Sequence, residues 1–264
     1  MYFPKDIYSL RLVYEYAVSK NIDYFIIGNG TNLVINESYF NKLFINLKEL
    51  NKIYYLKNNK VLMLAGINAS KASFVLAKKG YTKQEYLSVI PGSIGGAIYM
   101  NAGAYSSDIS NTIESVLVIE ENKLKLLSKE ECKFGYRKSM FMDHRNIIIV
   151  GGIFCFEKTK NKEKPLEKIR AYISNKRNNQ PLNLKSAGST FKNPKGISAW
   201  EVVDKLGYRG KVLGGAKVSE KHPNFLINQN HASFSDIYNL MLEITLKAKE
   251  VYNIDLECEW EILK

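Results

Sequence analysis

The segment "SVIPGSIGGAIYMNAGAYSSD", residues 88–108, places four glycines and a proline inside a run that is otherwise largely apolar. Glycine in the interior of a helix or a strand weakens either element, so this much backbone freedom needs a reason. Two explanations compete at this point. Either the glycines form tight turns between core strands, or they allow the backbone to lie directly against a bound ligand.

An earlier loop, "GNGTN" at 28–32, raises the same question. It begins like a dinucleotide fingerprint, but Leu33 stands where the third glycine belongs, and the residues that follow favour a strand over a helix. A Rossmann site is therefore excluded. A simple hairpin explains the loop as well as an anion site does, because Gly28 and Gly30 permit either arrangement. Two loops without side-chain bulk together suit an extended cofactor that contains a diphosphate.

The rest of the composition is that of a globular protein: 264 residues, 45% hydrophobic and 24% charged. The longest apolar run, residues 147–156, is too short to cross a bilayer and predicts a buried strand. Residues 1–16 lack the features of a signal peptide, so we expect a cytoplasmic protein without a membrane partner. Three scattered cysteines and three isolated histidines offer no metal-ligand spacing, and we expect no metal.

The formal net charge of +12 is compatible with a nucleic-acid partner, with an anionic small molecule, or with a simple compositional bias. Lysines are densest at 156–179, where such a run usually forms the solvated face of a helix. No nucleic-acid-binding motif accompanies them. We therefore expect no nucleic-acid partner and favour anionic small molecules.

Strands, helices and glycine-rich corners alternate down to about residue 156. Apolar spacing predicts a helix that Asp6 caps and Asn21 closes, and a second helix that Ser70 opens and Gly80 ends. We expect further helices at 198–206 and from about Ser235. The lysine-rich break near residue 160 predicts two domains, 1–160 and 161–264.

The final segment, "IDLECEWEIL" at 254–263, alternates apolar and acidic residues and predicts a half-buried strand with four carboxylates on its open face. Carboxylates two positions apart on a strand lie about 7 Å from each other, and their repulsion raises pKa values. A solvated acidic edge strand explains the same pattern, and the alternation does not distinguish among the four carboxylates.

Six motifs together resemble the UDP-N-acetylenolpyruvoylglucosamine reductases, flavoenzymes that complete the muramic acid precursor of the bacterial cell wall. They occur in family order over nearly the entire chain: "IIGNGTNLVI", "IPGSIGGAIYMNAGAY", "FGYRKSMF", "SAGSTFKNP", "GGAKVSEKHPNFLIN" and "LECEWEI". The resemblance implies an α+β fold, in which a two-lobed FAD-binding domain of the PCMH or vanillyl-alcohol-oxidase type precedes a smaller substrate-binding domain. It also implies NADPH as reductant and UDP-N-acetylglucosamine enolpyruvate as substrate, and we expect a monomer.

Carried over to this chain, the motifs imply Arg137, Ser189 and Glu259 as catalytic residues. They imply a flavin site made by Gly28, Asn29, Gly30, Thr31, Asn32, Leu33, Pro91, Gly92, Ser93, Gly95, Gly96, Asn101, Ala102, Gly103 and Ala104. The polar corner of "SAGSTFKNP" adds Asn193 as a hydrogen-bond partner of the substrate, and charge and placement add Tyr136, Lys217 and Lys221 as contacts of its diphosphate or sugar.

The implied reaction needs these residue types. Hydride addition to an enol ether that is conjugated to a carboxylate builds negative charge on that carboxylate, and a proton must reach the neighbouring carbon. Arg137 is always cationic and suits charge stabilisation. Ser189 is small and neutral and suits proton donation through a relay. Glu259 would feed that relay or, if protonated, polarise the intermediate. Taken singly, a surface ion pair explains Arg137 and a turn explains Ser189.

The chain departs from the family pattern at Glu261, where an arginine is usual, and at Trp200, where a small residue is usual. The resemblance also implies a member of the family's shorter branch that is N-terminally short by the strand unit with which members normally begin; a start placed too late, a weakened flavin site or replacement by another segment would each account for this. Two alternatives follow. One is another FAD-linked oxidoreductase with the same cofactor-binding fold, and the other is a flavin-poor, inactive relative that binds anions.

Overall fold

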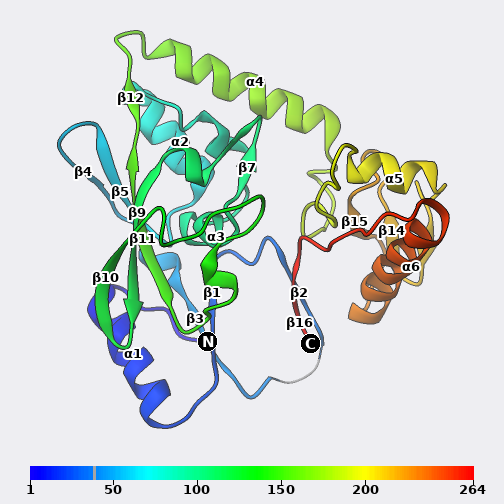
Figure 1. Cartoon of the computed structure of the whole chain (residues 1–264), viewed down its shortest axis with the longest axis horizontal. Coiled ribbons are helices and arrows are strands. Elements are labelled where there is room, and N and C mark those ends of the chain that lie inside the picture. The colour runs from blue at the N-terminus through cyan, green and yellow to red at the C-terminus, as the bar shows by residue number, and fades with distance from the viewer. Residues whose placement is uncertain (38–39) are drawn as a thin grey trace. The chain divides into compact units, whose positions relative to one another are not determined.

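The computed structural model describes residues 1–37 and 40–264 (Figure 1). Its contacts divide the chain into two compact units, which are described separately below. The first unit comprises Met1–Asn29 and Asn41–Ser174, and the second comprises Gly30–Phe40 and Asn175–Lys264. The boundary thus lies 14 residues beyond the predicted one at 160, and the second unit also takes in residues 30–40 from the glycine loop onward.

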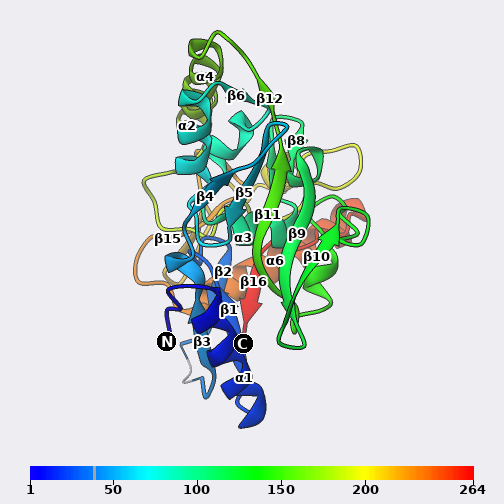
Figure 2. The same ribbon diagram turned by 90° about the vertical axis from the view of Figure 1, so that its left-hand side faces the viewer.

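The first unit is built on a five-stranded antiparallel sheet in the order β10-β9-β11-β5-β4, which Figure 2 shows with β11 between β9 and β5. Strands β1 and β3 form a separate parallel pair. The strands of these two sheets are β1 (Tyr24–Ile27), β3 (Leu43–Asn46), β4 (Ile53–Tyr55), β5 (Lys60–Leu64), β9 (Ile113–Glu120), β10 (Lys123–Ser128) and β11 (Ile148–Cys155).

Helix α3 (Ile94–Met100) packs against β11 and β5 and so places the glycine-rich segment on the sheet. Gly152 of β11 makes room for it, because a Cβ there would lie 3.0 Å from the Ile98 Cδ1 atom. The predicted buried strand at 147–156 is confirmed by β11, whose residues are mostly buried. Its two glycines are thus explained by the close approach of α3 and of neighbouring strands.

The remaining elements of the first unit are short or lie at its periphery. Helix α1 begins after Asp6, whose side chain accepts a hydrogen bond from the Ser9 amide, so the predicted cap is confirmed. The second predicted helix begins one residue before Ser70, because Asn68 rather than Ser70 caps it. These elements are α1 (Ile7–Ser19), α2 (Ala69–Lys78), β6 (Tyr81–Thr82), β7 (Gly103–Ala104), β8 (Ser107–Asp108) and β12 (Glu157–Lys158). The first unit also contains four short 3-10 helices: η1 (Leu47–Glu49), η2 (Glu85–Val89), η3 (Ile109–Asn111) and η4 (Met140–Met142).

Helix α4 (Glu163–Asn179) covers most of the lysine-rich run, and only Pro165 and Ile169 of its residues are buried. The prediction of a solvated helix face is therefore confirmed.

The second unit combines a three-stranded antiparallel sheet, β13-β14-β15, with two helices and one pair of parallel strands. The parallel pair joins β2 to the C-terminal strand β16, with Leu33 opposite Glu261. The hairpin alternative for the GNGTN loop is therefore wrong, because β1 and β2 pair with different strands. The elements are β2 (Leu33–Ile35), α5 (Ala199–Lys205), β13 (Val212–Leu213), β14 (Ala216–Val218), β15 (Leu226–Asn228), α6 (Phe234–Tyr252) and β16 (Glu261–Leu263).

The C-terminal strand is much shorter than the alternating pattern predicts. Only Glu261–Leu263 forms a strand, and Cys258 makes an isolated bridge to Phe191. Alternating burial persists as far as Trp260, because Leu256 and Trp260 still pack into the core of the second unit. The alternating pattern therefore predicted correctly which side chains are buried. A strand also requires a hydrogen-bonded partner along its whole length, and among the described residues such a partner exists only for 261–263.

Candidate active site

Within the first unit, the beginning of the GNGTN loop meets the glycine-rich segment at Gly28 and Ser93. A Cβ atom at Gly28 would collide with the Ser93 Oγ atom, so any larger residue there would force that serine side chain to move. The Gly28 carbonyl in turn accepts a hydrogen bond from the Asn46 Nδ2 atom at 3.1 Å. Two segments that are 65 positions apart in the sequence are thus brought to one place.

Backbone amides at this meeting point lack acceptors. Within residues 1–37 and 40–264, the amides of Gly28, Asn29, Gly92 and Ser93 donate no hydrogen bond. Gly92 and Ser93 are buried, and a buried amide without an acceptor is costly. An anionic group with several oxygen acceptors would satisfy such amides, as diphosphates do in backbone anion sites.

The first turn of α3 is different, because its amides are already used within the fold. The Ile94 amide donates to the Ile67 carbonyl and the Gly95 amide to the Ala65 carbonyl, both at 2.8 Å. The Gly96 amide donates to the Ser93 Oγ atom at 3.3 Å. An anion at this site would therefore be bound by the loop before the helix and not by the helix terminus.

The individual glycines of residues 88–108 serve different purposes. A Cβ at Gly95 would lie 2.8 Å from the Ala65 Cβ atom, and one at Gly103 would lie 2.5 Å from the Ser107 carbonyl oxygen. Gly92 adopts a φ of 100°, which L-residues rarely tolerate. Gly96 is exposed, and a Cβ there would meet only the Ser93 Oγ atom at 3.6 Å. Tight packing thus explains Gly95 and Gly103, whereas nothing in the described protein requires glycine at position 96.

Arg137 is tied to the turn that follows α3. Its Nη2 atom donates to the Gly103 carbonyl at 2.7 Å, and its guanidinium lies 5.2 Å from the centre of the Tyr136 ring. Asn101, which is 1% exposed, donates from Nδ2 to the Gly135 carbonyl at 2.8 Å and accepts from the Ser110 amide. The "FGYR" loop and the "NAGA" turn are therefore joined by two hydrogen bonds, one from each side.

The other predicted residues of this segment are placed by the same turn. The Ala102 amide donates to the Ala97 carbonyl, Ala104 lies in β7 opposite Ser107, and Pro91 is exposed ahead of the helix.

In the second unit, Ser189 and Glu259 belong to two segments that run side by side. The amide of Glu259 donates to the carbonyl of Thr190, the residue after Ser189, at 2.9 Å. Phe191 and Cys258 form an antiparallel bridge next to it. Ser189 and Glu259 are both half-buried, as a group that must meet both the protein and a ligand would be. The structure therefore places the segments that carry these two residues, 70 positions apart in the sequence, next to each other.

Asn32 fixes the Glu259 backbone from the other side. Its Nδ2 atom donates to the Glu259 carbonyl at 2.9 Å, and its own carbonyl accepts from the Glu261 amide. Asn32 thus has a structural task in the second unit, which the sequence did not indicate. Leu33, which follows it, pairs with Glu261 in the parallel strands.

Two residues that the sequence reasoning did not single out hold the Ser189 segment in place. Asn224, which is 4% exposed, accepts from the Phe191 amide at 2.9 Å and donates to the Phe191 carbonyl at 2.8 Å. Thr190 is fully buried, and its Oγ1 atom accepts from the Leu226 amide. Asn224 lies inside the matched motif "GGAKVSEKHPNFLIN", which was the only signal that could have found it.

The candidates for substrate contact already have partners within the protein. Asn193 accepts from the Ala199 amide at the start of α5. Lys217 lies 2.6 Å from a Glu220 carboxylate oxygen, and Lys221 donates to the Arg177 carbonyl at 2.6 Å. Tyr136 is 55% exposed. These lysines would have to exchange a protein partner for a phosphate oxygen.

The acidic face beside Glu259 is not a row of repelling carboxylates. Asp255 pairs with Lys249 at 2.8 Å, and Glu257 pairs with Lys192. Opposite charges close to both groups offset their repulsion. The regular strand of four carboxylates that the alternation predicted is therefore not formed, since only Glu261 lies in a strand.

His222 is the other titratable group of note in the second unit. Burial lowers the pKa of its imidazole, with a smaller contribution from the positive charge of Arg209. Its ring lies edge-on to Phe225, and its Nδ1 atom is buried without a hydrogen-bond partner among the described residues.

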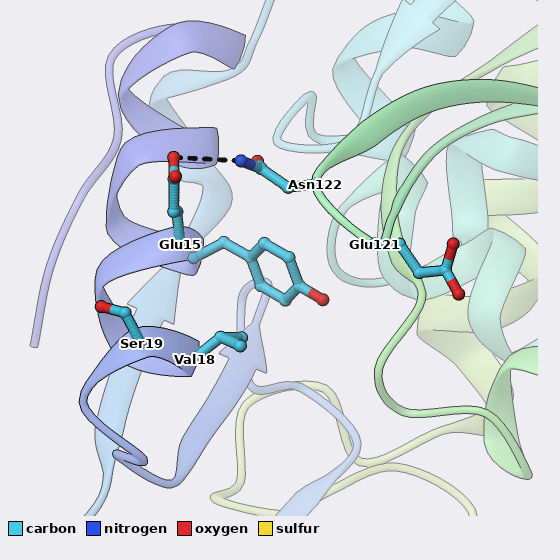
Figure 3. A pocket seen from close by; sticks show the side chains of 6 residues that line it. Glu15, Val18, Ser19, Glu121 and Asn122 are labelled. Atoms are coloured by element: carbon cyan, nitrogen blue, oxygen red, sulfur yellow. Dashed lines mark hydrogen bonds between the residues drawn. The ribbon is translucent and has the colours of Figure 1, made fainter.

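A cavity of about 330 Å³ lies elsewhere in the first unit, between α1 and the turn that joins β9 to β10 (Figure 3). Glu15 and Asn122 are joined across it by a hydrogen bond of 3.0 Å. None of the predicted site residues lines it. Among the described residues no cluster of histidine, cysteine or carboxylate side chains is arranged to hold a metal ion. No helix in the described ranges has the length and apolar character that a membrane span requires.

Comparisons with known proteins identify the two parts of the chain. A family model for an FAD binding domain matches residues 1–122, and a model for the C-terminal domain of UDP-N-acetylenolpyruvoylglucosamine reductase matches residues 180–263. The crystal structure of the reductase from Thermus caldophilus superposes with a TM-score of 0.82 at 29% identity, covering 99% of this chain and 91% of that one.

Relatives in sequence point the same way. The UDP-N-acetylenolpyruvoylglucosamine reductase of Fusobacterium nucleatum is 36% identical over 99% of this chain and 90% of its own length. That of Thermotoga petrophila is 36% identical over 98% of this chain and 90% of its own length. These matches confirm the predicted α+β fold of two domains and FAD as the cofactor. The chain belongs to the UDP-N-acetylenolpyruvoylglucosamine reductase family.

Proposed function

We propose that this protein reduces UDP-N-acetylglucosamine enolpyruvate to UDP-N-acetylmuramate, using FAD and NADPH. The observation that supports it most directly is family membership over nearly the full chain, together with a loop meeting point whose buried amides need acceptors. Bound FAD would supply the hydride, which it has first accepted from NADPH. The positive net charge suits this set of ligands, because all of them are anionic.

The FAD would be held by backbone more than by side chains. The amides of Gly28, Asn29, Gly92 and Ser93 provide donors for diphosphate oxygens. Exposed Gly96 leaves space beside them, because no Cβ projects from that position. We assign the remaining contacts to the rest of the predicted loops, residues 28–33 and 91–104.

Arg137 would stabilise the negative charge that develops on the substrate carboxylate during hydride addition. Its bond to the Gly103 carbonyl orients the guanidinium, which has five N–H donors and matches a carboxylate in a bidentate fashion. A preorganised cation stabilises the transition state more than the substrate, because the charge is larger there.

Ser189 would donate the proton to the carbon next to the one that receives the hydride. Its Oγ atom would be left as an alkoxide, so the serine needs a second proton donor. Glu259 lies on the neighbouring segment and would return that proton from its carboxyl group, either directly or through a water molecule. Thr190 and Asn32 hydrogen-bond to the Glu259 backbone and would thereby fix the position of Glu259 relative to the Ser189 segment.

We propose further that Lys217, Lys221 and Tyr136 contact the diphosphate or the sugar of the substrate and that Asn193 shapes this region. Acting on a nucleotide-activated cell-wall precursor, the enzyme would work in the cytoplasm, as a monomer, without a nucleic-acid or membrane partner. Loss of such an enzyme would impair cell shape, cell division and the cell cycle, because wall synthesis supports all three. Sedimentation of the purified protein tests the oligomeric state.

The function is tested by following the flavin absorbance of the purified protein. We expect a yellow protein, or one that becomes yellow on addition of FAD, whose flavin bands bleach with NADPH. The bands should return under anaerobic conditions only when UDP-N-acetylglucosamine enolpyruvate is added. A colourless protein that takes up no FAD would reject the proposal. Reoxidation by other acceptors but not by this substrate would indicate a different flavin oxidoreductase.

The proposed role of Ser189 is tested separately with Ser189→Ala. This variant should retain bleaching by NADPH and lose nearly all turnover, because only proton transfer to the substrate needs the hydroxyl. Ser19→Ala, which removes a hydroxyl from the end of α1, is the matched control and should behave like the wild type. Loss of both half-reactions in Ser189→Ala would place the serine in cofactor binding instead.

A further inference from the structure

The turn between β7 and β8 consists of Tyr105 and Ser106, both in the left-handed backbone region, with φ of 53° and 60°. A two-residue hairpin of this kind favours Asn-Gly, and non-glycine residues there carry a conformational cost. Tyrosine is an unfavourable choice for this backbone. Its side chain must therefore make contacts that offset the cost.

Those contacts are with helix α4. The rings of Tyr105 and Tyr172 stack with their centres 3.9 Å apart and their planes inclined by 5°. The Tyr105 hydroxyl donates to the Tyr172 carbonyl at 3.0 Å. Tyr105 therefore connects the turn to α4 by two contacts, one from its ring and one from its hydroxyl. Figure 1 labels β7 and α4.

The same face of α4 reaches the other end of the glycine-rich segment. Lys168 precedes Tyr172 by one helical turn, and its Nζ atom lies 5.6 Å from the centre of the Tyr172 ring. It also lies 3.8 Å from a carboxylate oxygen of Glu85, which is 4% exposed. Glu85 begins the short helix η2 that leads into Pro91. Helix α4 thus contacts residues on both sides of the segment that contains the proposed flavin loop.

We propose that Tyr105 and Tyr172 are positioning residues for the reductase reaction, acting through Gly103 and Arg137. Gly103 precedes Tyr105 by two residues, and its carbonyl accepts the hydrogen bond that orients the Arg137 guanidinium. Loss of the stack frees the turn to shift, and the acceptor for Arg137 moves with it. This inference rests on the role proposed above for Arg137.

The experiment compares Tyr172→Leu, Tyr172→Phe and Tyr105→Gly with the wild-type holoenzyme. Tyr172→Leu removes the stacked ring, whereas Tyr172→Phe retains both the ring and the carbonyl that accepts from Tyr105. Tyr105→Gly removes the ring and also relieves the left-handed backbone, so its melting temperature should stay close to that of the wild type. Tyr8→Leu, at a position 69% exposed on α1, is the matched control.

We expect kcat to fall about tenfold or more in Tyr172→Leu and Tyr105→Gly, because small displacements of a catalytic group have large effects. Flavin content and the rate of flavin reduction by NADPH should change less than twofold. Tyr172→Phe and Tyr8→Leu should resemble the wild type. This pattern separates positioning from a merely structural role, which would lower stability and flavin content together.

The inference is overturned if a folded, flavin-loaded Tyr105→Gly or Tyr172→Leu turns over within twofold of the wild type, or if Tyr172→Phe is as impaired as Tyr172→Leu. Arg137→Ala distinguishes this failure from that of the proposed function. An inactive Arg137→Ala beside fully active tyrosine variants rejects only the positioning role. A fully active Arg137→Ala rejects the role of Arg137 itself.

Discussion

Adjacent glycines in α3 offer a direct test of why this segment is rich in glycine. Gly95 faces Ala65, and a Cβ added there would lie 2.8 Å from the Ala65 Cβ atom and 3.2 Å from the Ala65 carbonyl oxygen. Gly96 is exposed, and its Cβ would make one ordinary contact at 3.6 Å. Gly95→Ala and Gly96→Ala therefore add the same methyl group to the same helix in two different surroundings.

The magnitudes follow from the two surroundings. Alanine stabilises a helix interior by about 0.5–1 kcal/mol relative to glycine. At Gly95 this gain is opposed by overpacking against Ala65, which costs about 1–3 kcal/mol. We expect Gly95→Ala to lower the free energy of unfolding of the apoprotein by about 1–2 kcal/mol. We expect Gly96→Ala to raise it by about 0.5–1 kcal/mol.

For FAD binding the order of the two variants should be reversed, with Gly96→Ala losing more affinity than Gly95→Ala. If exposed Gly96 makes space for the cofactor, Gly96→Ala should weaken FAD binding by about tenfold, or about 1.4 kcal/mol, although its apoprotein is more stable. Urea unfolding of the apoprotein and fluorescence titration with FAD measure the two quantities. An unchanged affinity in Gly96→Ala would refute the assignment of Gly96 to the cofactor site. A Gly95→Ala apoprotein as stable as the wild type would refute the packing argument.

Three further predictions concern single residues. Asn224→Ala should destabilise the protein by about 2–4 kcal/mol in urea unfolding, because it leaves the buried amide and carbonyl of Phe191 without partners, and a loss below about 1 kcal/mol would contradict this. Arg137→Lys should lower kcat by about 10²-fold with flavin content unchanged, since a point charge replaces an oriented fork; loss of flavin would instead indicate cofactor binding. His222 has a folded-state pKa below its ordinary 6.5, so the unfolded chain takes up the proton first and the free energy of unfolding should fall as the pH drops below about 6.5. Urea unfolding at pH 7.5 and 5.5 should show this dependence reduced in His222→Gln, and an equal dependence in both proteins would rule it out.

Local features were predictable from the sequence because neighbouring residues determine them. The Asp6 cap of α1, the buried strand at 147–156 and the exposed face of α4 all depend on propensity and burial over a few turns. The family and its cofactor were equally accessible, since six motifs in a fixed order carry that information without any structure.

The pairing of strands was not accessible in the same way. Alternation at 254–263 indicated which side chains are buried, but only Glu261–Leu263 finds a strand partner, and that partner is β2. Likewise the loop at 28–32 was as compatible with a hairpin as with an open turn. The pairing of strands depends on contacts between segments that are distant in the sequence, and the strand propensity of each segment does not specify its partner.

The sequence by itself thus determined helices α1, α2, α4, α5 and α6, the buried strand at 147–156 and, through its motifs, the kind of chemistry. Only the tertiary structure decided that Ser93 rests against Gly28, that Arg137 is oriented by Gly103, and that the Glu259 amide is bound to the residue after Ser189. The physical reason is that these contacts join residues 34 to 69 positions apart, and their geometry exists only once both partners are packed into the same unit.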